Sequence, residues 1–238
     1  MTPVSNDLAH ERIAVIVLAA GSSSRMDGVD KIWADLGGVP LLAHSLRTAS
    51  MLAGVTDIVV VSSGARHADI TALASKAGVE VRCIEGGARR QDSVARGIEV
   101  APDADYYLVH DGARPLARAP LFTRVLDAAR LHSAVVPVVP VVDTVKRLDG
   151  HGRVLETVDR SALAAVQTPQ GFAGELLRRA HREVTADATD DASMVEALGE
   201  PVVTVTGDSA NLKVTTPRDL VIARALLAAA SQADGSEG

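Results

Sequence analysis

Short apolar runs alternate with amphipathic stretches along the chain through about residue 131. The apolar runs are predicted β-strands, and they lie at residues 13–18, 57–61, 80–84, 106–109 and 134–139. Proline suits the first turn of a helix, and three predicted helices begin at Pro40, Pro120 and Pro217. Alternating strands and helices are typical of a parallel sheet covered by helices. The pattern therefore predicts an α/β fold with a mostly parallel central sheet.

The alternation breaks between residues 138 and 167. Two extended runs there flank the turn sequence Asp149-Gly150-His151-Gly152, which predicts a β-hairpin. A hairpin has little hydrophobic support of its own in water. We therefore expect this arm, about residues 138–160, to pack on a second copy of the chain and form a homodimer. The alternative is an arm folded back on its own domain.

The chain, at 238 residues, is long enough to bury one full core. We expect a single domain over residues 1–238, with a core formed by about residues 12–137 and 161–230. Small and polar residues dominate the end of the chain, so a disordered tail is expected at about residues 231–238.

Composition narrows the classes of function. The net charge is −6 and no cluster of Lys or Arg dominates, which argues against nucleic-acid binding. Cys83 is the only cysteine, so an intrachain disulfide is impossible and a reducing cytoplasm is expected. The first twelve residues lack a secretion signal, and no apolar run reaches about 18 residues, so we expect no membrane span. The histidines form no H-x-x-x-H pattern, which disfavours a zinc site.

A loop of small residues follows the first predicted strand. Its members lack bulk, so their backbone N–H groups can approach an anion closely; they include Ala19, Ala20, Gly21 and Ser23. Arg25 and Lys31 add positive charge, a layout that suits a triphosphate. The loop matches neither G-x-x-x-x-G-K-[ST] nor G-x-G-x-x-G. An ordinary strand-to-helix connection with two solvated basic residues is the alternative.

Two further polar loops follow predicted strands, at residues 86–92 and 110–115. In open α/β sheets, ligands bind outside the carboxyl ends of the strands. We therefore expect these two loops and the small-residue loop to converge on one site.

Seven motifs in the chain occur together, in order, in one known family. They are LAAGSSSRM with Lys31, EGGARRQDSV, VHDGARP, DTVKR, TVDRSALAAVQTPQGF, TDDASMVE and NLKVTTPRDL. On these motifs the chain resembles the 2-C-methyl-D-erythritol 4-phosphate cytidylyltransferases of the non-mevalonate isoprenoid pathway. The resemblance implies a single nucleotidyltransferase-type (Rossmann-like) domain with a protruding β-hairpin arm. It also implies transfer of the cytidylyl group of CTP to 2-C-methyl-D-erythritol 4-phosphate, with release of pyrophosphate.

The same resemblance assigns roles to individual residues. The implied catalytic residues are Arg25, Lys31, Arg160 and Lys213. The implied nucleotide-binding residues are Ala19, Ala20, Gly21, Ser23, Gly86, Gly87, Arg90, Ser93, Asp111 and Gly112. The acceptor substrate is expected to contact Thr144, Arg160, Lys213 and Asp111. A divalent metal, usually Mg²⁺, is expected at Asp111, because a carboxylate suits a hard cation.

Other interpretations remain open. Read without the family, Arg160 and Lys213 are ordinary surface cations, and Asp111 is a turn residue at a strand end. Asp92 or Ser93 could be a helix N-cap instead of a nucleotide ligand. A cytidylyltransferase for another polyol phosphate, such as ribitol 5-phosphate, is one alternative function. A nucleotide-binding regulator without turnover is another, because a fold by itself does not establish a function.

Overall fold

The computed structural model describes residues 11–21 and 30–235 and is built around one eight-stranded sheet. Its strands are β1 (Ile13–Leu18), β4 (Val55–Ser62), β5 (Arg82–Glu85), β6 (Tyr106–Asp111), β7 (Ala134–Pro140), β10 (Ala164–Val166), β11 (Gln170–Ala173) and β12 (Val203–Thr206). The strand order is β10, β7, β11, β6, β1, β4, β5, and β12 also pairs with β7. The third predicted strand, at residues 80–84, corresponds to β5, which begins two residues later than the apolar pattern indicated, at Arg82.

Strands β5, β4, β1 and β6 pair in parallel, as do β12 and β7. Strand β11 runs antiparallel between β6 and β7, and β10 pairs antiparallel with the end of β7. The prediction of a mostly parallel α/β sheet is confirmed. The antiparallel register places the start of β11, and Thr168 just before it, against the carboxyl end of β6, where the candidate site lies.

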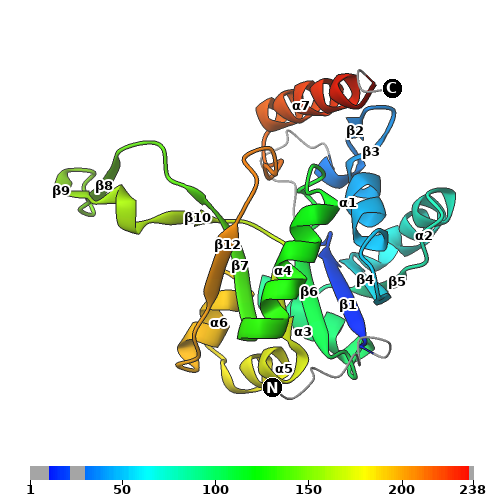
Figure 1. The fold of residues 1–238 in the computed structure, drawn as a ribbon, viewed down its shortest axis with the longest axis horizontal. Coiled ribbons are helices and arrows are strands. Elements are labelled where there is room, and N and C mark those ends of the chain that lie inside the picture. The colour runs from blue at the N-terminus through cyan, green and yellow to red at the C-terminus, as the bar shows by residue number, and fades with distance from the viewer. Residues whose placement is uncertain (1–10, 22–29, 236–238) are drawn as a thin grey trace, which may run out of the picture.

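Helices cover both faces of the sheet (Figure 1). They are α1 (Leu41–Ser50), α2 (His67–Lys76), α3 (Arg90–Val100), α4 (Ala119–His132), α5 (Gly174–Glu183) and α6 (Asp191–Ala197). Helix α7 (Pro217–Gly235) lies beyond the sheet and packs against the segment that precedes α1. Alternate residues of β1 face opposite sides of a sheet. Val15 and Val17 pack in a core with α1, α2 and α4, whereas Ala14 and Ile16 pack with α3, α5 and α6. This burial on both faces explains the unbroken apolar run of β1.

The predicted arm is a two-stranded hairpin, β8 (Val145–Leu148) paired with β9 (Val154–Val158). Its turn is closed by the N–H of Asp149, which donates to the carbonyl oxygen of Arg153. Figure 1 shows the hairpin projecting well away from the sheet. Apolar side chains along it are exposed, among them Val142, Leu148, Val154 and Leu155. The arm therefore does not fold back on its own domain.

The end of the chain differs from the expectation. Helix α7 continues to Gly235, past the position at which the sequence predicted a disordered tail. The run LLAAASQAD has high helix propensity, so the helix that begins at Pro217 extends through the small residues that resemble a tail. Residues beyond 235 lie outside the described part of the chain.

Candidate active site

The three predicted loops meet at a cavity of about 380 Å³. It opens at the carboxyl ends of β1 and β6, beside the short helix η2 (Lys31–Trp33) and the start of α3. Its lining is Leu18, Ala19, Ala20, Gly21, Lys31, Ile32, Gly87, Ala88, Arg89, Arg90, Ser93, Asp111, Ala113 and Lys213. Asp111 is the one acidic group among the lining residues that the structure describes, and basic side chains surround it, an arrangement that favours an anionic ligand.

Asp111 is the charged centre of the cavity and is only 9% exposed. Its carboxylate lies 2.8 Å from Lys213 Nζ, 3.7 Å from Arg114 Nε and 4.0 Å from Arg90 Nε. Burial acts to raise the pKa of Asp111, but Lys213, Arg90 and Arg114 together hold that pKa below its ordinary value. Its backbone N–H donates to the hydroxyl oxygen of Thr168. The carboxylate is therefore ionised and fixed in place.

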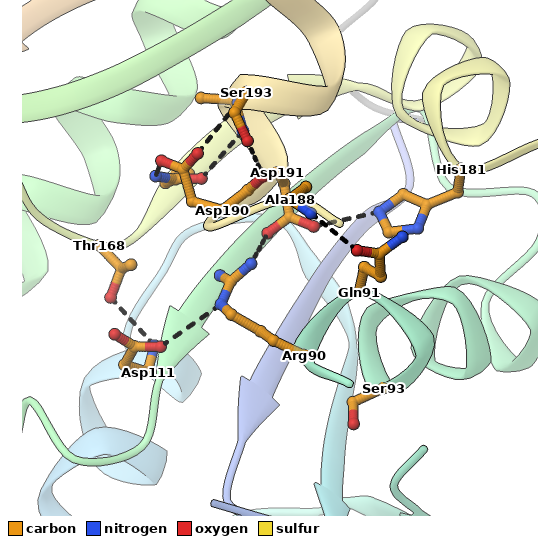
Figure 2. Close-up of polar contacts among 12 residues, drawn as sticks. Arg90, Gln91, Ser93, Asp111, Thr168, His181, Ala188, Asp190, Asp191 and Ser193 are labelled. Atoms are coloured by element: carbon orange, nitrogen blue, oxygen red, sulfur yellow. Dashed lines mark hydrogen bonds and ion pairs between the residues drawn. The ribbon is translucent and has the colours of Figure 1, made fainter. Parts of the chain in front are cut away.

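Arg90 connects Asp111 with a second, fully buried carboxylate, Asp191 (Figure 2). Arg90 Nη1 lies 2.6 Å from Asp191 Oδ2, and His181 Nε2 lies 3.1 Å from Asp191 Oδ1. Burial acts to raise the pKa of Asp191, but Arg90 and His181 outweigh it and lower that pKa. Asp191 is therefore an ionised group behind the cavity wall.

Glycine is required where the loop before α3 passes the loop after β1. A Cβ added at Gly86 would lie 2.7 Å from the Cβ of Ala20, and one at Gly87 would lie 2.3 Å from the Cβ of Asp92. The N–H of Gly87 donates to Ser93 Oγ. Gly86 therefore allows this loop to approach the loop after β1, and Gly87 allows it to approach the first turn of α3. These close approaches form one wall of the cavity.

The alternative interpretation of Asp92 or Ser93 as the N-cap is wrong, because the N-cap of α3 is Arg89 and Asp92 is the third residue of the helix, in a capping box. The carboxylate of Asp92 accepts a hydrogen bond from the backbone N–H of Arg89 and pairs with the Arg89 side chain at 2.7 Å. Asp92 thus stabilises the start of α3, whereas Ser93, on the same turn, lines the cavity.

The structure brings together most, but not all, of the residues that the sequence singled out. Those that line the cavity are Ala19, Ala20, Gly21, Lys31, Gly87, Arg90, Ser93, Asp111 and Lys213. Gly86 and Gly112 support the lining; the N–H of Gly112 donates to the carbonyl oxygen of Leu18 and joins the ends of β6 and β1. Ser23 and Arg25 lie outside the described residues.

Thr144 and Arg160 are not at this cavity. Both are exposed residues of the arm, and Arg160 donates to the carbonyl oxygen of Val142. Arg160 also lines an open groove of about 800 Å³ at the base of the arm, together with residues 204–206 of β12. Within one chain, these two predicted acceptor residues are therefore separate from the predicted nucleotide residues.

Sequence reasoning missed several members of the site. Arg114 follows Asp111 by three positions in the sequence and lies 3.7 Å from its carboxylate. Both residues belong to the VHDGARP motif, which could have pointed to Arg114. Thr168 contacts Asp111, from which it is 57 positions away in the sequence. Asp191 contacts Arg90, from which it is 101 positions away. Only their presence within two of the recognised motifs pointed to them.

The lowered pKa values of Asp111 and Asp191 predict that the folded protein loses stability in acid. Their folded-state pKa values lie below the ordinary 3.8. Their contribution to stability is therefore complete above that value and is lost as pH falls through the folded-state values. Asp191→Asn is expected to lower the free energy of unfolding by about 3–5 kcal/mol at neutral pH, because Arg90 loses its closest partner. Denaturant unfolding at a series of pH values should show this deficit shrinking as the solution is acidified. The exposed Asp143→Asn serves as the control, and an equal deficit at all pH values would contradict the prediction.

No helix in the described ranges combines the length and apolar character needed to cross a membrane. Across the same residues, His, Cys, Asp and Glu side chains do not gather in groups of three that could hold a metal ion.

Comparison with known proteins identifies the family. The model of the IspD family, 2-C-methyl-D-erythritol 4-phosphate cytidylyltransferase, matches residues 13–229. The chain is 44% identical to the enzyme of that name from Prochlorococcus marinus over 220 residues, covering 90% of this chain and 97% of the relative. It is also 44% identical to the one from Rhodococcus jostii over 217 residues, covering 90% and 95%.

Solved structures agree with this result. The 4-diphosphocytidyl-2C-methyl-D-erythritol synthase of Anaerococcus prevotii matches with a TM-score of 0.82 and 29% identity, over 91% of this chain and 96% of that one. The 2-C-methyl-D-erythritol 4-phosphate cytidylyltransferase of Thermus thermophilus matches with a TM-score of 0.72 and 37% identity, over 89% and 97%. The chain thus belongs to the 2-C-methyl-D-erythritol 4-phosphate cytidylyltransferase family.

Proposed function

We propose that the chain transfers the cytidylyl group of CTP to 2-C-methyl-D-erythritol 4-phosphate, giving 4-diphosphocytidyl-2-C-methyl-D-erythritol and pyrophosphate in isoprenoid precursor biosynthesis. The observation that carries the proposal is the cavity in which Lys31, Arg90 and Lys213 surround Asp111 beside two glycine-containing loops. Family membership over nearly the whole chain supports the choice of substrates.

In this reaction a phosphate oxygen of the acceptor attacks the α-phosphorus of CTP, and pyrophosphate leaves. The attacking oxygen is already an anion, so the protein need not remove a proton from it. The main requirements are to align two polyanions and to stabilise the charge that develops in the transition state. Lys31, Lys213 and the amides of the small-residue loop suit these tasks. We assign Lys31, with Arg25, to the α-phosphate and the departing pyrophosphate, and Lys213 to the acceptor phosphate.

His110 does not suit the role of a general base. It is fully buried and does not line the cavity. Burial is the main cause that lowers its pKa to about 4. The ring packs against Phe122, with a centroid distance of 5.0 Å, and its Nδ1 lies 3.2 Å from Thr168 Oγ1. These contacts give His110 a structural role next to Asp111.

The charge of Asp111 fits a divalent metal, and we infer that Mg²⁺ binds there. The ionised carboxylate lines the cavity in which the CTP phosphates are proposed to lie. Mg²⁺ is commonly held by one or two carboxylates together with substrate phosphates, so a single aspartate fits this ion when the nucleotide supplies further oxygens. When bound, the ion would neutralise phosphate charge.

We also propose that the arm completes the active site of a second subunit in a homodimer. Thr144 and Arg160 are distant from the cavity of their own chain, and the projecting hairpin exposes apolar side chains that association would bury. In the partner's site, Arg160 and Thr144 would bind the methylerythritol phosphate.

The single cysteine, Cys83, suits a chain that works in the reducing cytoplasm.

Pyrophosphate release by the purified chain tests the function. We expect release with CTP, Mg²⁺ and 2-C-methyl-D-erythritol 4-phosphate, and little with ATP, GTP or UTP. Preference for ribitol 5-phosphate would reassign the acceptor. Binding of CTP without release from either acceptor would replace the enzyme with a nucleotide-binding regulator.

A further inference from the structure

Behind the cavity wall, a series of polar contacts extends from Arg90 through Asp191 to His181 (Figure 2). Arg90 is the first residue of α3, and its guanidinium lies between two carboxylates. Asp191, on the side away from the cavity, is the closer partner, at 2.6 Å from Nη1. Asp111, in the cavity, is 4.0 Å from Nε. The contact with Asp191 therefore determines the position of the Arg90 guanidinium more than the contact with Asp111 does.

Asp191 is itself held firmly. One of its carboxylate oxygens contacts Arg90 and the other contacts His181 of α5, so the carboxylate cannot rotate without losing a partner. Neighbouring contacts keep α3 and the segment before α6 together. The side chain of Gln91 donates to the carbonyl oxygen of Ala186 and accepts from the N–H of Ala188. The packing of α3, α5 and α6 therefore fixes the distance between Asp191 and Arg90.

Removing Asp191 would leave Asp111 as the closest carboxylate to Arg90. The guanidinium would then turn toward Asp111, on which Lys213 already lies at 2.8 Å. Because Arg90 and Asp111 both line the cavity, this movement would change the shape and charge of the space in which CTP is proposed to bind.

We propose that Asp191 is a positioning residue for CTP binding, which acts through Arg90 by holding its guanidinium in the cavity wall and preventing a closer contact with Asp111 than the present 4.0 Å. The inference rests on the proposed function for the identity of the nucleotide. His181 contributes by fixing the orientation of the Asp191 carboxylate.

A double-mutant cycle on CTP affinity tests the proposal. The dissociation constant is measured by calorimetry, without acceptor, for the wild-type chain, Asp191→Asn, Arg90→Met and the double variant. Asp191→Asn is expected to weaken CTP binding about tenfold in the wild-type background and less than about twofold in the Arg90→Met background. A purely structural role for Asp191 would weaken binding by the same factor in both backgrounds. That result, or no change in the wild-type background, would overturn the proposal.

Two further variants keep the cycle decisive. Asp190→Asn removes the neighbouring carboxylate, which accepts from the N–H of Ser193 and from Gln170, while the Asp191 to Arg90 pair remains intact; its CTP affinity is expected to match the wild type. If Asp191→Asn does not fold, as judged by circular dichroism, Asp191→Glu takes its place in both backgrounds. It keeps the charge but displaces the carboxylate by one methylene.

The outcomes for this inference and for the proposed function can be told apart. A wild-type chain that binds CTP but releases no pyrophosphate would contradict the proposed function, and the cycle on CTP affinity would still decide the role of Asp191. Additive effects in an active enzyme would overturn only the role of Asp191. A wild-type chain that binds no CTP would overturn both.

Discussion

The Lys31→Met variant is expected to lower kcat for pyrophosphate release by a factor of about 10²–10³, the usual effect of removing one group that stabilises transition-state charge. Lys31 lines the cavity from η2, and a Cβ placed on Gly21 would lie 3.8 Å from its Nζ. The ammonium group is therefore close to the backbone of the small-residue loop, so both can act on the same phosphate. Methionine keeps most of the side-chain length and removes the charge.

The two kinetic constants separate binding from catalysis in this variant. If Lys31 acts mainly on the transition state, kcat falls by more than KM for CTP rises. Lys76→Met is the matched control, because Lys76 is exposed on α2 and does not line the cavity. It is expected to retain wild-type kinetics. A Lys31→Met variant with unchanged kcat would remove Lys31 from the proposed mechanism.

Co-expression of Lys31→Met and Arg160→Met chains is expected to restore activity that neither variant has alone. If the arm crosses between subunits, each site combines Lys31 of one chain with Arg160 of the other. A mixed dimer then contains one site with both defects and one intact site. Random pairing makes half of the dimers mixed, so activity should recover to about a quarter of the wild-type value per chain.

The same experiment tests the placement of the arm. If Arg160 served its own chain, every site in the mixture would carry one defect, and activity would stay at the level of the single variants. That result would contradict the proposed role of the arm across the dimer. Refolding the two variants separately and mixing them only in the assay gives a control in which subunits have little time to exchange.

The sequence by itself determined the features that depend on local pattern. Burial on both faces of a strand requires an unbroken apolar run, so β1 could be predicted from residues 13–18. The hairpin turn and the loops after β1 and β6 were visible for a similar reason, since tight turns and close backbone approach favour small residues. The family motifs then pointed to Lys31, Asp111 and Lys213, which line one cavity.

Only the tertiary structure decided features that depend on contacts between distant segments. Strand β11 has the sequence Gln-Gly-Phe-Ala, with no apolar run to mark it, and it is a strand because β6 and β7 lie on either side. The exposed, projecting arm is likewise a property of the whole fold, because the pattern of a hairpin does not specify its docking. Asp191 meets Arg90 from 101 positions away, and no local periodicity records such a pair. Local patterns record which faces are buried, whereas the partners of a charged side chain are set by how the buried elements pack together.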